Sequence, residues 1–176
     1  MKIEWVHFPL HPDTPAEGRL LTDLFAGRKV DLGAMQRDMK ARMAAEGLPY
    51  GERTRTYNSR LAQELGKWAD TQPGGEAIHD ALFHAYFVDA RDISQPAVLL
   101  DIVERLGLPV EAAREVLERR TFKDAVDADW TLSRQYGITG VPTFVAGRYG
   151  VVGAQPYEAL VQLVRKAAPE GGEAGA

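Results

Sequence analysis

The spacing of apolar positions changes twice along the chain. Residues 2–8 alternate around Ile3, Trp5 and Val6, which predicts a strand. After a proline-rich connector, apolar residues recur every three or four positions as far as about Tyr136, which predicts about six helices. Residues 143–145 and 149–152 then predict a β-hairpin, and the apolar spacing after Pro156 predicts a final helix.

Turn and cap residues divide the helical region. A helix is expected from Glu17 to a C-cap at Gly27, and Asp31 is a suitable N-cap for the next one. Asn58 or Ser59 is expected to start a further helix. Three methionines fall on one face of the helix after Asp31, and that spacing favours burial in the core, with an adaptable peptide-binding surface as the alternative. They are Met35, Met39 and Met43.

Composition limits the classes of function. The chain has 176 residues, 45% of them hydrophobic and 26% charged, so a packed core is expected. A formal net charge of -4 disfavours a nucleic-acid partner, and the lack of an apolar run of about 18 residues disfavours a membrane span. The first residues lack an apolar signal segment, so a cytoplasmic location is expected. The Gly- and Glu-rich stretch 169–176 is expected to be disordered.

Cysteine is missing from the 176 residues. Disulfides, thiolate nucleophiles, thiolate metal sites and dithiol redox chemistry are therefore excluded for these residues. Prolines hold the stretch around His7, His11 and Asp13 extended, so a metal site is not expected there, and no cofactor is expected. His79 and His84 are expected to be structural or exposed, and no serine lies in a Gly-x-Ser-x-Gly elbow.

Several segments carry a family resemblance. Residues 137–145, Gly-Ile-Thr-Gly-Val-Pro-Thr-Phe-Val, followed by Gly-Ala-Gln-Pro at 153–156, resemble the proline loop, hairpin and helix start of DsbA-family proteins. Residues 8–18 resemble the FrnE-like branch of that family. The Asn-Ser-Arg sequence at 58–60 and the stretch 85–93 also fit that branch. The resemblance spans about residues 1–168 and becomes specific through the order and spacing of these motifs.

The resemblance implies an α/β, thioredoxin-like (DsbA-type) fold with a large inserted helical lobe. Residues 1–16 and 121–168 would form the thioredoxin-like part and residues 17–120 the inserted helical domain. The strand at 2–8 and the C-terminal hairpin are expected to share one sheet. Full-length relatives carry an earlier strand and a Cys-x-x-Cys helix before the strand matched by residues 2–8. This chain lacks that β-α unit, whose strand would be central in the sheet.

The resemblance also implies where ligands bind. The Val141–Pro142 bond is expected to be cis, with the backbone before the proline pairing with extended substrate. The substrate-binding residues would be Thr139, Gly140, Val141 and Pro142. A second region faces the active-site groove in the family and is expected to meet an anion or a peptide carboxylate, with a solvated loop as the alternative. Its residues are Arg53, Arg55, Tyr57 and Asn58.

Three functions stay open. The first is a protein without redox activity of its own that binds a peptide or a small, thiol-containing molecule near the proline loop. The second is an enzyme similar to kappa-class glutathione transferases and 2-hydroxychromene-2-carboxylate isomerases. Residues 153–156 differ from their usual Gly-Gln-Asp-Arg, and their catalytic serine lies in the missing helix. The third is a fragment of an active dithiol oxidoreductase.

A homodimer is the expected assembly. Loss of a central strand would leave two open strand edges, and open edges pair with other chains. Two copies would complete the sheet by pairing or exchanging their N-terminal strands. The residues expected at this contact are Trp5, Val6 and Phe8.

Overall fold

The computed structural model describes residues 3–168, which form two compact units. Residues 3–10 and 129–168 make the terminal unit, and residues 11–128 make the helical unit. The sequence placed the junctions after residue 16 and before residue 121. They shift because Asn58 donates to the carbonyls of Pro12 and Thr14, and Arg60 donates to the carbonyl of Lys123 and pairs with Asp127. The tail 169–176 lies outside the described residues.

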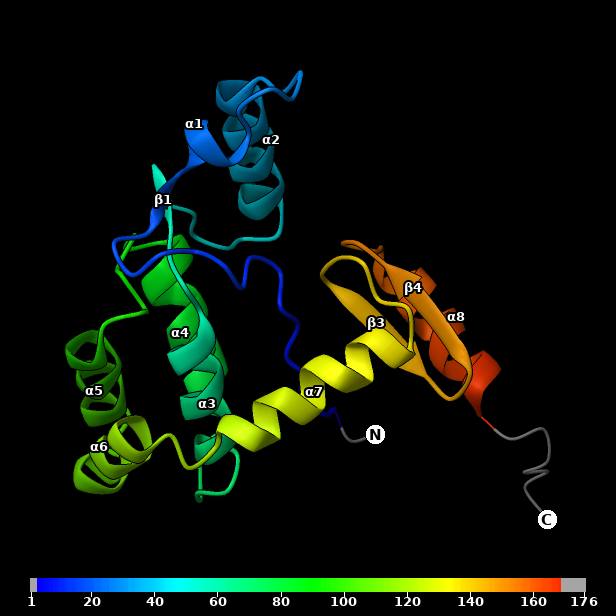
Figure 1. The fold of residues 1–176 in the computed structure, drawn as a ribbon. Coiled ribbons are helices and arrows are strands. Elements are labelled where there is room, and N and C mark those ends of the chain that lie inside the picture. Colours follow the sequence, from blue (N-terminus) through cyan, green and yellow to red (C-terminus); the bar gives the residue numbers. More distant parts are fainter. Residues whose placement is uncertain (1–2, 169–176) are drawn as a thin grey trace, which may run out of the picture. The chain divides into compact units, whose positions relative to one another are not determined.

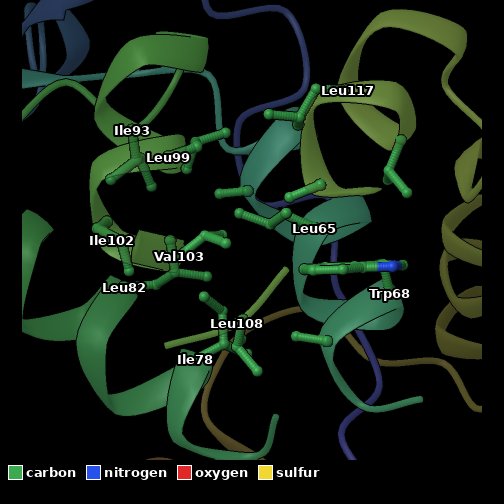
Figure 2. Close-up of a cluster of buried hydrophobic side chains, with 14 of the residues drawn as sticks. Leu65, Trp68, Ile78, Leu82, Ile93, Leu99, Ile102, Val103, Leu108 and Leu117 are labelled. Atoms are coloured by element: carbon green, nitrogen blue, oxygen red, sulfur yellow. The ribbon is translucent and has the colours of Figure 1, made fainter. Parts of the chain in front are cut away.

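Four helices enclose the core of the helical unit: α3 (Arg60–Ala69), α4 (Ala77–Phe87), α5 (Pro96–Arg105) and α6 (Val110–Arg119). Their apolar faces meet as the 3.6-residue spacing predicts. Figure 2 shows these side chains interlocking between the helices. Burial of this apolar area is the main force that holds the four helices together. The largest fully buried apolar side chains of this core are Leu65, Ile78, Leu99 and Val103.

The start of the helical unit differs from the sequence-based expectation. Where one helix from Glu17 to Gly27 was predicted, β1 (Arg19–Leu20) precedes a single turn, α1 (Leu21–Leu24). β1 pairs antiparallel with β2 (Arg55–Thr56), so the backbone of residues 19–20 bonds across the ladder instead of along a helix. Apolar spacing alone could not show this competing partner.

α2 (Leu32–Ala45) begins as predicted, with the Asp31 side chain accepting a hydrogen bond from the Ala34 N–H at 2.9 Å. The core interpretation of its methionines is wrong, because no residue of this helix is buried. Met35 and Met39 are 36% and 42% exposed. The spacing correctly put them on one face, but a periodic pattern does not tell whether another element covers that face.

In the terminal unit, β3 (Thr143–Ala146) and β4 (Tyr149–Val152) form the predicted hairpin. Gly147 makes its turn at a φ of 56°, a conformation that glycine adopts without the steric penalty of a Cβ. α8 (Tyr157–Ala167) packs against both strands and buries Leu163 (Figure 1). α7 (Lys123–Gln135) begins in the helical unit and ends in this one.

The expected strand at residues 2–8 is wrong for the residues described. Residues 3–8 form no strand, and the hairpin sheet contains β3 and β4. Side chains of α7 hold this segment instead. The His7 N–H donates to Asp129 Oδ2 at 2.9 Å, and the Ser133 hydroxyl donates to the His7 carbonyl at 3.3 Å. Alternating apolar residues favour an extended chain, but a strand also needs an adjacent edge with matching backbone groups.

Candidate functional site

The proline loop lies between α7 and β3 in the terminal unit. α7 ends at Gln135, and Gly137 reverses the chain at a φ of 65°. The Val141–Pro142 peptide bond is cis. Val141, Pro142 and Thr139 are exposed and Gly140 is half-buried, so the structure brings the four expected substrate-binding residues together on one accessible loop.

Two hydrogen bonds fix this loop to the hairpin. The Thr143 hydroxyl donates to the Gly140 carbonyl at 2.7 Å, and the Gly153 N–H donates to the Pro142 carbonyl at 2.8 Å. Among the hydrogen bonds of residues 3–168, none uses the N–H or the carbonyl of Val141. The loop is therefore held in place while the backbone polar groups of Val141 remain open to a ligand.

The register of the hairpin extends this open backbone along β3. In an antiparallel pair, residues that bond across to the partner strand alternate with residues that point away from it. The Gly153 N–H bonds to the Pro142 carbonyl, so Pro142 points toward β4. Phe144, two residues further along, therefore also bonds across to β4. Thr143 and Val145 consequently direct their N–H and carbonyl groups away from β4, and Val141, just before the cis bond, makes no backbone hydrogen bond. No strand of the described residues covers that side of β3.

The surface of the hairpin is apolar. Phe144 is 38% exposed, Val145 48% and Val152 60%. Successive residues of a strand point to opposite faces, so Phe144 and Val145 expose apolar area on both faces of the hairpin. We refer to the outer side of β3, from Val141 to Val145, as the β3 edge. It combines open backbone groups with exposed apolar side chains, the features that make a strand edge associate with another chain.

Three of the four expected groove residues line one pocket in the helical unit. Its volume is about 90 Å³, and its lining residues are Glu52, Arg53, Thr54, Arg55, Tyr57, Tyr86 and Ala90. The guanidinium of Arg53 lies 4.6 Å from the centre of the Tyr86 ring and 5.1 Å from that of Phe87. Its Nη1 also donates to the Tyr86 hydroxyl at 2.7 Å. We call this the arginine pocket.

Asn58 does not belong to this pocket. Its amide donates to the carbonyls of Pro12 and Thr14 at 3.2 and 3.0 Å, and its Oδ1 accepts from the Arg60 N–H at 2.9 Å. Asn58 therefore ties the connector to the start of α3 and does not line the pocket that holds the other three expected groove residues. Ser59, the alternative cap, makes no capping hydrogen bond with its side chain.

Four pocket residues escaped the sequence reasoning: Glu52, Thr54, Tyr86 and Ala90. Tyr86 was assigned only to the apolar face of its helix, although a tyrosine at such a place also brings a hydroxyl that needs a partner. The sequence therefore contained a signal that could have placed the Tyr86 hydroxyl in a polar contact. Ala90 adopts a φ of 53° without any turn residue to announce it, so nothing in the sequence could have found it.

The histidines occupy separate environments. His79 is buried, with Nε2 2.8 Å from Asp70 Oδ1, whereas His84 lies on the surface near Asp89. Burial, with added repulsion from Arg19 and Arg28, lowers the pKa of His11. Across residues 3–168, no three His, Asp or Glu side chains are placed to hold a metal ion.

The three serines make structural contacts, and the Ser59 hydroxyl accepts a hydrogen bond from Gln63 Nε2 at 3.2 Å. The buried Ser133 hydroxyl lies 3.0 Å from the Asp129 carbonyl, and the Ser94 hydroxyl donates to Asp92 Oδ1 at 2.5 Å. Neither contact is with a histidine that could act as a base. None of the helices described is both long and apolar enough to cross a membrane.

The residues expected at a dimer contact are accessible. Trp5 and Val6 are each 42% exposed, Ile3 is 72% exposed, and Phe8 is half-buried. They lie on the irregular segment held by α7, where apolar area remains in contact with solvent.

Comparison with solved structures gives consistent matches. A probable DsbA oxidoreductase, SCO1869 from Streptomyces coelicolor, is 32% identical with a TM-score of 0.83, over 95% of this chain and 75% of that one. A 2-hydroxychromene-2-carboxylate isomerase is 20% identical with a TM-score of 0.62, over 77% of this chain and 64% of that one. The cytosolic disulfide reductase DsbM from Pseudomonas aeruginosa, solved with GSH, is 23% identical with a TM-score of 0.53, over 77% and 72%.

A comparison with curated proteins gave no match. The family comparison, in contrast, matches residues 1–165 to the DsbA-like thioredoxin domain. This match covers almost the whole chain and agrees with the likeness to SCO1869 and with the proline loop, hairpin and final helix described above. The chain belongs to the DsbA-like thioredoxin domain family.

Proposed function

We propose that these residues form a non-redox binding protein that receives an extended peptide along the β3 edge. The observation that carries this proposal is the outward direction of the backbone groups of Thr143 and Val145, next to the unbonded backbone of Val141. Each of these residues offers one N–H donor and one carbonyl acceptor in the alternation that an added antiparallel or parallel strand requires. Strand addition of this kind gives affinity through main-chain hydrogen bonds.

Side chains add an apolar contribution to this binding. Val141 and Val145 are 49% and 48% exposed beside the open backbone. A peptide with Val, Ile or Phe at alternate positions would cover them and remove apolar area from water. The favoured ligand is therefore an extended segment with apolar residues at every second position, rather than a folded partner.

The absence of cysteine makes this binding non-covalent. A dithiol oxidoreductase needs a thiolate to attack a disulfide, and these residues have none. The description of SCO1869 as a probable oxidoreductase therefore does not transfer as an activity. The proposal keeps only the expectation, implied by the family resemblance, that the proline loop contacts the ligand. It includes no redox chemistry.

We also propose that the chain belongs to the FrnE-like branch and that it functions in the cytoplasm. The cytosolic description of DsbM supports the cytoplasmic location. DsbM was solved with GSH, so glutathione is the thiol-containing small molecule to compare with a peptide. The isomerase alternative rests on a likeness of fold at 20% identity. The Ser133 and Ser94 hydroxyls are occupied by structural contacts and do not add to that alternative.

Residue-resolved amide exchange by NMR tests the proposal. In the free protein, the amides of Val141, Thr143 and Val145 should exchange rapidly, whereas that of Phe144 should be protected. The probe is a peptide alternating Val and Thr with a Lys at each end, and the control is the same peptide N-methylated at alternate residues. Binding should slow exchange at the three open amides by about tenfold or more with the probe and not with the control.

Equal effects of both peptides would show that backbone pairing is not involved. No change with either peptide would reject strand addition at this edge. Glutathione is the third compound to be tested by amide exchange. Protection of Val141 by glutathione, with Thr143 and Val145 unchanged, would replace the extended peptide by a small ligand at the loop.

A further inference from the structure

The arginine pocket contains an excess of positive charge. Arg60, Arg91 and Arg120 each pair with a carboxylate at 2.6 to 2.7 Å. Within the described residues, neither Arg53 nor Arg55 forms such a pair. Glu52 also lines the pocket, so two guanidinium groups face one carboxylate there.

Arg53 is held in a defined position. Its planar guanidinium lies over the rings of Tyr86 and Phe87, and its Nη1 bonds to the Tyr86 hydroxyl. The Tyr86 hydroxyl lies 2.9 Å from the hydroxyl of Thr56, which fixes the ring in turn. An arginine restrained in this way loses little further side-chain entropy when it binds a ligand.

One donor of Arg53 remains unused. Its Nε is buried and has no hydrogen-bond partner. A buried donor without a partner carries a desolvation cost, which a ligand acceptor would remove once the surrounding side chains moved to admit it. Arg55 contributes a second guanidinium, held by its Nη1 bond to the Glu17 carbonyl at 3.3 Å.

The shape of the pocket fits a small polar group. A volume of about 90 Å³ holds several water molecules and therefore a group of a few heavy atoms. Gly51 lets the loop lie directly against the end of α4, since a Cβ at this position would be 2.0 Å from the Val88 carbonyl oxygen. Ala90, at a φ of 53°, closes the lining in a conformation rare outside glycine, and such residues cluster at binding sites.

We infer that the arginine pocket binds the carboxylate or phosphate group of a small molecule, with Arg53 and Arg55 as its donors. Guanidinium groups suit such oxygens because their N–H groups match two acceptors at once. This site belongs to the helical unit and is independent of the peptide-binding proposal for the β3 edge.

NMR titration of the full chain with inorganic phosphate, and separately with acetate, tests this inference. The Arg53 Nε–H signal should shift and saturate with at least one of them within the millimolar range. Arg55→Gln should weaken that binding by about tenfold or more. Arg42→Gln, at an exposed position on α2, is the matched control and should leave the affinity unchanged.

The two probes distinguish the source of the ligand group. Saturation by phosphate alone would indicate a phosphorylated molecule, and saturation by acetate alone a carboxylate. Arg53→Lys keeps the charge but loses the planar fork, so it should also weaken binding while the backbone spectrum stays folded. Lack of saturation with both probes, or equal affinity in Arg55→Gln and Arg42→Gln, would overturn the inference.

Discussion

The buried carboxylate of Glu64 on α3 accepts two hydrogen bonds from the Arg120 guanidinium. Arg120 Nε donates to Oε2 and Nη2 donates to Oε1, each at 2.6 Å. Arg60 adds a third bond to Oε1 at 2.6 Å, and Arg60 also pairs with Asp127 at 2.8 Å. The Glu64 side chain is completely buried, so these bonds replace the water that the carboxylate loses on folding.

Glu64→Gln should therefore destabilise the helical unit. Removing the negative charge leaves Arg120 and Arg60 without their carboxylate, and breaking a buried ion pair costs about 3 to 5 kcal/mol. Because Arg120 is 41% exposed, we expect about 3 kcal/mol. Urea unfolding followed by circular dichroism measures this change. Glu115→Gln, which breaks the exposed pair with Arg119, should cost less than about 1 kcal/mol; equal costs would contradict the prediction.

Stability should fall in acid because of the same carboxylate. Burial raises the pKa of Glu64, but the hydrogen bonds from Arg120 and Arg60 outweigh it and hold that pKa below its usual value of 4.5. The stability that its ionised form contributes is thus present above pH 4.5 and is lost as the pH falls through the lower, folded-state pKa. The Arg91 contact lowers the pKa of Asp101, and contacts from Lys123 and Arg60 lower that of Asp127, which act in the same direction.

Unfolding free energies measured from neutral pH down through this range check the acid effect. The wild-type curve should fall more steeply below pH 4.5 than that of Glu64→Gln, since the variant no longer has that carboxylate to protonate. Parallel curves would show that Glu64 does not contribute to the acid response.

We propose a homodimer through the N-terminal segment that carries Trp5, Val6 and Phe8. Exposed apolar residues on this segment would lose their contact with water at such a contact. Light scattering over a dilution series should give twice the chain mass, and Trp5→Ser with Val6→Thr should lower it to the mass of one chain. Leu48→Ser, at a position 52% exposed in the helical unit, is the control. A monomer at micromolar concentration would reject the proposal.

Gly51→Ala should disturb both stability and the arginine pocket. The added Cβ would fall 2.0 Å from the Val88 carbonyl oxygen, so the loop must move. Overpacking of this kind costs about 1 to 3 kcal/mol. Thermal unfolding and phosphate titration measure the two effects. Gly33→Ala on α2 is the control, because a Cβ there would meet only side-chain atoms, the flexible end of Arg37 at 3.2 Å and Asp31 Oδ1 at 3.3 Å. Since alanine favours a helix over glycine, this change should not destabilise the chain.

The sequence by itself determined the helices of the core, the cap at Asp31, the hairpin and the final helix. These depend on local spacing and on turn residues, which act between positions close in the chain. The proline loop was recognisable because its motif is continuous, from Gly137 to Val145. The count of cysteines alone showed that these 176 residues contain no dithiol.

Only the tertiary structure decided which surfaces are covered. Met35 and Met39 have the spacing of core residues but remain exposed, and residues 3–8 have the alternation of a strand but bond to side chains of α7. Tyr86 joins Arg53 across a separation of 33 residues, and Arg120 meets Glu64 across 56. Such outcomes depend on partners distant in the chain, whose positions a local pattern does not contain.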